Sequence, residues 1–285
     1  MNPALSFLHW MGRTLAIILL VLLGSTALVR YAPGYLSDAR EMDSRYAAEA
    51  HTELSAEAAR SRSIPQMVAA EIAGWIRGDF GTSRQYEVPV SELIGPRIAA
   101  SAGLLLRGIG VAWILALCAA LIASAGRNPS FLWQTPATLL LAIPTAALAT
   151  FCLLADSGGP VLVMALLLAA RDFKFLDQVL RKAWREPHIL QARAQGIGTG
   201  RLLVAHLAPS LVPQLGALAS LSIVTALSAL VPVEVIFNVP GLGQLAWNAA
   251  LNRDLPVLLA VMILMALAVT FSGTAAARAE GWKSA

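Results

Sequence analysis

Side chains that commonly perform catalysis or hold metals are few and scattered in this sequence. Four histidines show no metal-ligand spacing: His9, His51, His188 and His206. No Walker-type phosphate loop is present, and the glycines of Gly196–Gly200 follow no predicted strand, so they are not a dinucleotide fingerprint. Gly81-Thr82-Ser83 is not a nucleophile elbow. The sequence therefore predicts a non-catalytic chain that binds no metal or cofactor of its own.

Composition indicates a membrane protein. The chain has 285 residues, of which 57% are hydrophobic and 13% are charged, whereas a soluble domain carries roughly a quarter charged residues. Apolar runs of about 20 residues recur, which is typical of an all-α polytopic membrane protein. The net charge of +4 resides in membrane-flanking loops without an aromatic–basic patch, which argues against nucleic-acid binding. Cys118 and Cys152 lie in predicted spans, and nothing implies a disulfide.

The apolar runs predict six transmembrane helices with both termini in the cytoplasm. The predicted spans are Thr14–Val29, Ile98–Ala125, Phe131–Leu154, Ser157–Ala170, Leu207–Val233 and Leu255–Ala277. The first run also resembles a cleaved signal peptide, but five later spans favour an uncleaved helix. Pro136 and Pro144 predict kinks in the third span. Apart from the long first outer loop, Lys and Arg collect in the loops assigned to the cytoplasm, as the positive-inside rule requires.

This topology predicts three regions. Residues 1–30 hold the N-terminus and the first span, residues 31–97 form a long extracytoplasmic loop, and residues 98–285 form a five-helix core with a cytoplasmic loop at 171–209. The fourth span is short, because it loses its apolar character at Arg171. We expect it to continue as a helix into the cytoplasm through Phe173–Trp184.

The polar, basic stretch Arg181–Pro209 lies between two predicted spans and must face water. Ala192 and Gly196 are four residues apart, so they share one helix face and allow close backbone approach. Gly196, Gly198 and Gly200 then predict the end of this helix and a sharp bend. The residues alone support equally an ordinary basic loop and a docking surface for a cytoplasmic partner.

Ala192-Arg193-Ala194-Gln195-Gly196, with a histidine ten residues after the glycine, resembles the cytoplasmic loop of ABC-importer permeases. The match is to the dipeptide/oligopeptide/nickel branch, in which this loop forms a coupling helix seated in a groove of the ATPase subunit. The broader superfamily has a glutamate where Leu190 stands here, which is a departure. The resemblance implies an ATPase-coupling loop made by Ala192, Arg193, Ala194, Gly196, Gly198, Gly200, Arg201 and His206.

Two further blocks resemble the same branch. Gly-Asp-Phe-Gly-Thr-Ser at 78–83 is similar to its G-D-[LF]-G-x-S element, and the stretch at 234–256 is similar to its E-x-x-F-x-x-P-G-x-G … R-D-x-P segment. We expect an extracytoplasmic gate or turn built by Glu234, Phe237, Pro240, Gly241, Gly243, Arg253, Asp254 and Pro256. The alternative is a Pro-Gly turn with Glu234 as a surface charge. Leu242–Trp247 suggests a short re-entrant or interfacial helix.

The resemblance implies a type I ABC-importer permease fold in a bacterial inner membrane, with many passes. Such a subunit forms half of the translocation pathway for peptides or similar small solutes. The implied partners are a second homologous permease, two ATPase subunits that bind ATP and Mg, an extracytoplasmic substrate-binding protein and membrane lipid. Asp156–Pro160 is shorter than the family's segment between the third and fourth spans, so the cargo stays open.

Two other classes of function remain as alternatives. An ion-coupled secondary transporter would carry intramembrane Asp, Glu or His side chains along a pathway. The predicted apolar runs between the second and sixth spans contain none, and Glu234 stands at an edge. A non-transporting membrane scaffold is the other alternative. Co-purification with an ATPase pair would separate the importer from both.

Overall fold

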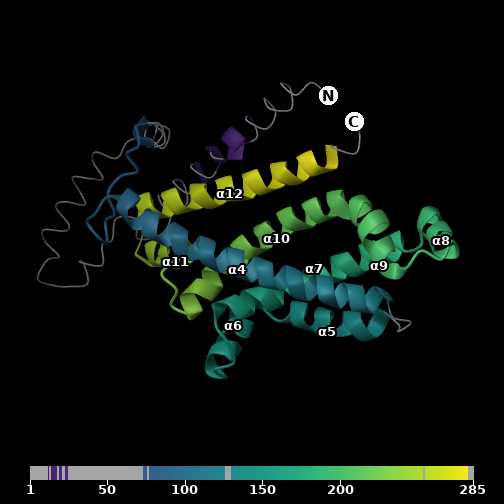
Figure 1. Ribbon diagram of the computed structural model, residues 1–285. Helices are drawn as coiled ribbons and strands as arrows, with labels where there is room; N and C mark the ends of the chain where they lie inside the picture. The colour runs from purple at the N-terminus through teal and green to yellow at the C-terminus, as the bar shows by residue number, and fades with distance from the viewer. Residues whose placement is uncertain are drawn as a thin grey trace, which may run out of the picture. The chain divides into compact units, whose positions relative to one another are not determined.

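The computed structural model describes residues 73–75, 77–125, 130–252 and 254–281, together with positions 12, 14–17, 19–20 and 23–24 (Figure 1). Within these residues the secondary structure is helical, apart from turns and one isolated bridge between Thr82 and Pro89. The predicted all-α class is therefore confirmed. Much of the predicted first span and of the long loop lies outside the described residues.

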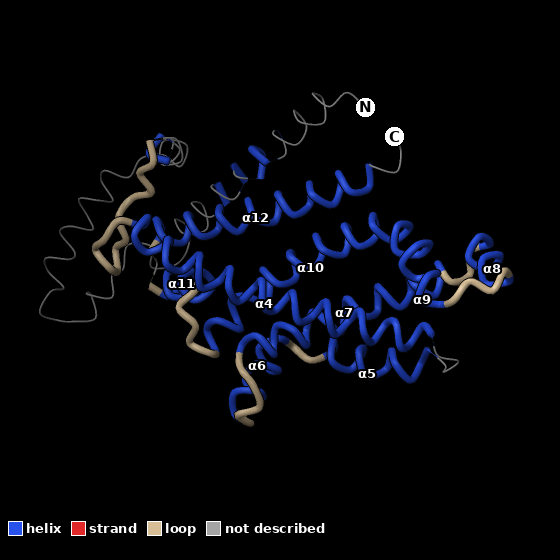
Figure 2. The backbone as a smooth tube through the Cα atoms, in the orientation of Figure 1, coloured by secondary structure: helices blue, strands red, loops and turns tan. Residues whose placement is uncertain are grey.

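The helices follow one another with short connections (Figure 2). In chain order they are α4 (Val90–Ala125), α5 (Ser130–Ala142), α6 (Thr145–Leu154), α7 (Pro160–Ala183), α8 (Pro187–Ala194), α9 (Thr199–Leu202), the π-helix η2 (Leu203–Leu207), α10 (Ala208–Ile236), α11 (Leu242–Leu251) and α12 (Leu255–Gly281).

Three described helical segments are long and apolar enough to cross a membrane: Val90–Ser124, Leu211–Ile236 and Leu255–Gly273. They correspond to the second, fifth and sixth predicted spans. A fourth is added if Leu132–Ala142 and Thr145–Leu154, bent by 92°, are one broken span. Pro144 stands at that bend, as predicted, whereas Pro136 lies inside α5. Six spans and cytoplasmic termini stay predictions.

The chain divides into two compact units. Each unit combines two separate stretches of sequence, whereas each of the three predicted regions is continuous. The first comprises Met1–Ile98 and Gln244–Leu267, and the second comprises Ala99–Gly243 and Ala268–Ala285. The start of α11 thus belongs to the second unit and its remainder to the first. We describe the two units separately.

The core of the second unit is organised around α7, which packs against α5, α6 and α10. Small residues on α4 make room for side chains of α7. A Cβ on Gly108 would lie 2.5 Å from Cγ of Met164, so only glycine fits there without a shift. Further along, buried Ala116 and Ala120 join the same apolar cluster as Phe173 and Leu176 of α7.

Helix α7 continues beyond Ala170 as a single helix, as predicted, but this continuation is partly buried. It begins at Pro160, a favoured first helical residue, and runs unbroken to Ala183 with Arg181 and Lys182 in its last turn, where cations complement the helix dipole. The residues after Ala170 do not form a purely solvated extension. Asp172 and Asp177 are fully buried, because neighbouring helices supply polar partners for them.

Candidate functional site

Glu234, near the end of α10, folds back onto the start of α11. Its Oε2 accepts a hydrogen bond from the Gly243 backbone N–H at 2.7 Å, and its Oε1 accepts one from the Ser101 hydroxyl at 2.6 Å. Ser101 Oγ in turn accepts the Leu242 N–H at 2.7 Å. The first two amides of α11, which lack partners within the helix, are thereby satisfied by side chains. A carboxylate at this position also complements the positive end of the helix dipole.

The glycines of the same segment make room for this carboxylate. A Cβ on Gly241 would lie 2.1 Å from Glu234 Oε1. A Cβ on Gly243 would lie 2.8 Å from Cα of Val231 on α10. Both distances are shorter than Cβ contacts in real structures, so the spacing of Glu234, Gly241 and Gly243 follows from one closely packed turn. We call these three residues together with Ser101 the Glu234 clasp.

A second clasp lies in the first unit. Asp254 precedes α12, and its Oδ2 accepts a short hydrogen bond from the Ser83 hydroxyl and a longer one from the Gln85 N–H at 3.2 Å. Ser83 Oγ also accepts the Tyr86 N–H at 3.0 Å. The sequence blocks at 78–83 and 254–256 therefore meet, and a Cβ on Gly81 would contact Pro256 Cβ at 3.4 Å.

The gate residues were expected to include charges exposed at a membrane edge, and the structure places them differently. Glu234 and Asp254 are each 0% exposed, so neither is a surface charge. Both are held by hydrogen bonds within their own unit, which lowers the penalty of burying them, although Asp254 Oδ1 has no hydrogen-bond partner among the described residues. Phe237 is half-buried after α10, and Pro240 is exposed. Arg253 lies outside the described residues.

The basic stretch forms a helix, a turn and a helix, as predicted. Helix α8 ends in a Schellman motif, in which the Gly196 N–H bonds to Arg193 O and the Ile197 N–H bonds to Ala192 O. Gly196 has a φ of +79°, which favours glycine. Gly198 then precedes α9 with an ordinary φ of −63°. We call the segment from Pro187 to Leu202 the elbow.

The elbow is exposed on one side and anchored on the other. Ile189 is 1% exposed and belongs to the apolar cluster that contains Leu180 of α7 and Leu211 of α10. The Arg193 guanidinium lies over the Trp184 ring at 5.7 Å, a cation–π contact between α8 and the end of α7. Leu190 is 51% exposed, although it is apolar. Helix α8 is therefore connected through Ile189 to the apolar cluster that α7 and α10 share, and through Arg193 to the end of α7.

Two details of the elbow differ from the sequence prediction. Ala192 is only 6% exposed, so it faces this chain and does not share an outward face with Gly196. Gly200 lies inside α9 and does not break a helix. The remaining predicted residues Arg193, Ala194 and Arg201 are exposed. His206 lies in η2, and its side chain is outside the description.

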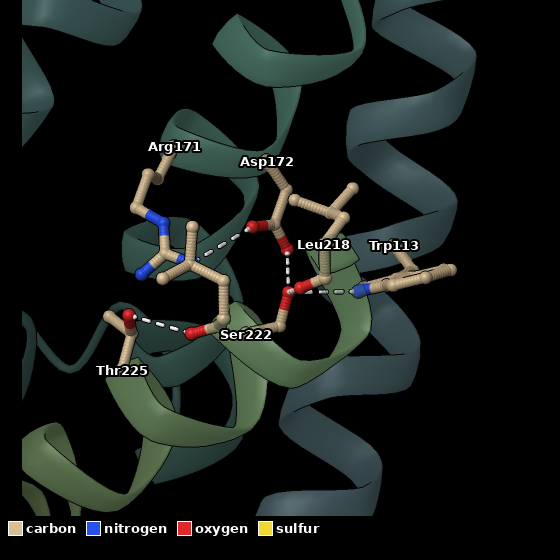
Figure 3. Close-up of polar contacts among 7 residues, drawn as sticks. Trp113, Arg171, Asp172, Leu218, Ser222 and Thr225 are labelled. Atoms are coloured by element: carbon tan, nitrogen blue, oxygen red, sulfur yellow. Dashed lines mark hydrogen bonds and ion pairs between the residues drawn. The ribbon is translucent and has the colours of Figure 1, made fainter. Parts of the chain in front are cut away.

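A third polar group lies at the middle of three helices in the second unit (Figure 3). Ser222 Oγ of α10 is 2.9 Å from Asp172 Oδ2 of α7, and the Trp113 Nε1–H of α4 donates to the same hydroxyl at 3.2 Å. Sequence reasoning missed this group, as it missed Ser101 and Ser83 as clasp partners. Isolated serines in apolar runs were the available signal, since a buried hydroxyl requires a partner.

No group of three or more His, Cys, Asp or Glu side chains that could hold a metal ion occurs in the described part of the chain. Its buried carboxylates are separate from one another and are engaged by serine, amide or guanidinium groups.

Long apolar helices joined by tight turns, with one exposed basic elbow anchored to the core, define a multi-pass membrane protein. Residues 108–280 match the family described as "Binding-protein-dependent transport system inner membrane component". The oligopeptide transport system permease protein OppB of Escherichia coli K12 is 27% identical over 211 residues, covering 66% of this chain and 69% of OppB. The glutathione transport system permease protein GsiC of Shigella flexneri is 27% identical over 216 residues, covering 69% and 70%.

The matched region spans more than half of the chain, so the chain belongs to this family of transport system inner membrane components. It is a transmembrane permease component of an ABC importer.

Proposed function

We propose that this chain forms half of the translocation pathway of a bacterial importer for peptides or similar small solutes. The names of OppB and GsiC support this cargo class. In this proposal the chain crosses the membrane six times with both termini inside and pairs with a second homologous permease. Two ATPase subunits bind ATP and Mg, a substrate-binding protein delivers cargo from outside, and the chain itself catalyses no reaction.

The observation that carries the proposal is the construction of the elbow. Its exposed positions have no role that the chain itself explains: Leu190 exposes half of an apolar side chain, and no heavy atom lies within 4 Å of a Cβ placed on Gly198 or Gly200. A partner surface that covers them would bury the leucine and use the open space at the glycines. Arg193 and Arg201 add positive charge to the exposed side, which suits an acidic groove.

The contacts that anchor the elbow to the core support a mechanical connection between the elbow and the long helices. Ile189 packs with residues of both α7 and α10, and Trp184 carries the Arg193 contact at the end of α7. A groove that pulls on α8 would shift these two long helices together, because close-packed cores transmit strain and do not absorb it. We infer that closure of the ATPase subunits acts on the pathway through this connection.

The Glu234 clasp has a different task in this account. It ties the end of α10 to Leu242 and Gly243, the first two residues of α11, and its buried polar atoms tie that turn to α4 through Ser101. We propose that the clasp keeps the extracytoplasmic turn rigid, so that movement of α10 is passed on to it. The exposed Pro240 at its tip is a candidate contact for the substrate-binding protein.

Purification from native membranes tests the proposal most simply. The chain should co-purify with a second permease and an ATPase pair, and vesicles containing the complex should accumulate peptide only with ATP and the binding protein present. Uptake driven by an ion gradient without an ATPase would instead establish a secondary transporter. Purification of the chain alone, with no solute uptake, would support a scaffold.

A further inference from the structure

In the polar group of Asp172, Ser222 and Trp113, too few hydrogen-bond donors face Asp172 to stabilise an ionised carboxylate. The Ser222 hydroxyl lies 2.9 Å from Asp172 Oδ2 and 2.8 Å from the Leu218 carbonyl oxygen. It accepts the Trp113 indole N–H at 3.2 Å (Figure 3). A hydroxyl has one proton, so it donates to the carboxylate or to the carbonyl, and not to both.

A proton on Asp172 completes this network. The carboxylic acid then donates to Ser222 Oγ, which uses its second lone pair to accept the Trp113 N–H as well. The Ser222 proton is free to reach the Leu218 carbonyl oxygen, and each of the three protons has an acceptor. With Asp172 ionised, a fully buried charge would receive a single hydrogen bond from a neutral hydroxyl, which is poor compensation for its lost hydration.

Arg171 compensates Asp172 only in part, as a long ion pair without a hydrogen bond. Its Nη2 is 3.9 Å from Asp172 Oδ1, beyond hydrogen-bond distance. Asp172 Oδ1 and the Arg171 Nε and Nη2 atoms are buried and have no hydrogen-bond partner among the described residues. The arginine and the aspartate therefore form a long ion pair without a hydrogen bond in this arrangement of helices, and a small movement would bring them into hydrogen-bond distance.

Asp177 of the same helix shows what a compensated carboxylate looks like in this core. It is equally buried, but Arg181 Nε donates to its Oδ1 at 2.8 Å and Gln134 Nε2 donates to its Oδ2 at 3.0 Å. Arg181 also donates to the Ala123 carbonyl oxygen, which fixes the guanidinium in place. Both oxygens of Asp177 thus have hydrogen-bond donors, one of them a charged guanidinium.

The helices packed around α7 offer Asp172 no other charge. Helix α5 contains no titratable side chain, and α6 contains only the thiol of Cys152. On α10 the one titratable group is Glu234, which is held in its own clasp. On α4 the nearest charged residue in sequence to Trp113 is Arg107, whose Nε donates to the Gly103 carbonyl of its own helix. On α7 itself, Lys174 donates to Thr138.

We propose that Asp172 is a proton-binding site of the assembled transporter. It holds a proton while α7 packs on Ser222 of α10, and it releases the proton to water when these helices move apart and Arg171 comes within hydrogen-bond distance of its carboxylate. The ligand of this site is a proton, and its binding is linked to the packing of α7 against α10. The proposal adds a pH-sensitive step to the transport cycle and rests on the proposed function only for the identity of that cycle.

Difference infrared spectroscopy of the complete transporter in lipid vesicles tests the site directly. The carbonyl stretch of a protonated carboxylic acid should be present in the wild type and absent from Asp172→Asn. Asp177→Asn is the matched control on the same helix and should retain the band. Ser222→Ala should shift the band, because the acid loses its acceptor. A wild-type spectrum from which Asp172→Asn removes no acid band would overturn the proposal.

The pH dependence of cargo-stimulated ATPase activity gives a second readout. Asn is neutral and similar in shape to the protonated acid, so Asp172→Asn should assemble and hydrolyse ATP with a flattened pH profile. Failure of Asp172→Asn to assemble, or an unchanged profile, would contradict a neutral Asp172. The infrared band needs no transport, so a chain that fails to import peptides would still reveal whether this carboxyl carries a proton.

Discussion

Glycine-rich segments lie on both sides of α10, with the elbow before this helix and the Glu234 clasp after it. The surroundings of the glycines differ between the two segments. At the Glu234 clasp, a Cβ on Gly241 would lie 2.1 Å from the Glu234 carboxylate, and a Cβ on Gly243 would lie 2.8 Å from Val231. At the elbow, a Cβ on Gly196, Gly198 or Gly200 would meet no heavy atom within 4 Å. The clasp is filled by the chain itself, whereas the elbow is open.

This difference distinguishes two reasons for which a sequence motif can be required: packing within the chain, and contact with a partner. The clasp motif is explained by internal packing and hydrogen bonds, so substitutions there should lower stability. In the elbow only Gly196 is required by the chain, through its φ of +79°. Substitutions elsewhere in the elbow should leave stability unchanged and should affect whatever covers it. The following predictions test this separation, beginning with the largest expected effect on stability.

Replacing Glu234 by Ala should cause the largest loss. The Gly243 N–H and the Ser101 hydroxyl would both lose their acceptor, and each unsatisfied buried group costs about 1–3 kcal/mol. Thermal unfolding of the purified transporter, followed by loss of monodisperse protein, measures the effect. Glu234→Gln is the control, because it keeps an acceptor and should lose less. Equal unfolding temperatures for Glu234→Ala and wild type would refute the clasp.

Replacing Gly241 by Ala should be the next most harmful change. The new methyl group would displace the Glu234 carboxylate, and overpacking of this kind costs about 1–3 kcal/mol. Because both changes act on one carboxylate, the losses of Gly241→Ala and Glu234→Ala should not add in the double variant. Additive losses would show that the glycine acts through something other than Glu234.

Removing the Ser83 hydroxyl should destabilise the first unit. In Ser83→Ala, Asp254 Oδ2 keeps only the 3.2 Å bond from the Gln85 N–H, and the Tyr86 N–H loses its acceptor. The expected loss is about 1–3 kcal/mol. Faster proteolysis or hydrogen exchange across residues 81–90 would report it. Thr82→Ala is the neighbouring control, and an identical response from both variants would argue against the Ser83–Asp254 bond.

Gly196→Ala should have the smallest effect on stability of these four changes. A side chain at a φ of +79° costs about 1–2 kcal/mol, without any steric clash. Gly198→Ala carries the same added methyl group at a φ of −63° and should be neutral. If the two variants unfold at the same temperature, the left-handed turn after α8 is not what ends this helix.

The sequence predicted those structural features that are determined by residues close together in the chain. The helices α4, α10 and α12 follow from apolar runs, and the bend at Pro144 follows from a residue that cannot continue a helix. Gly196 was identified as the bend for the same reason, since its role is set by its own backbone angle.

The failures concern residues whose partners are distant in the sequence. Nothing near Asp172 in the sequence indicated its partners, because Ser222 lies 50 positions after it and Trp113 lies 109 positions before Ser222. Glu234 was predicted to stand at the edge of a span, because Ser101, which donates a hydrogen bond to it, lies 133 residues earlier in the sequence. Ala192 was assigned to the outward face of α8, but it is Leu190 that the packing of Ile189 turns outward.

The measurement that tests the central claim most directly is cargo uptake by a transporter carrying Gly198→Leu. The chain itself tolerates this change, because Gly198 has an ordinary φ and open space around its Cβ position. Membrane insertion and unfolding temperature should therefore match the wild type. If the elbow docks in an ATPase groove, the added side chain should prevent docking or uncouple ATP hydrolysis from peptide uptake in vesicles that contain the binding protein. Normal coupled uptake by Gly198→Leu would contradict the account and make the elbow an ordinary cytoplasmic loop.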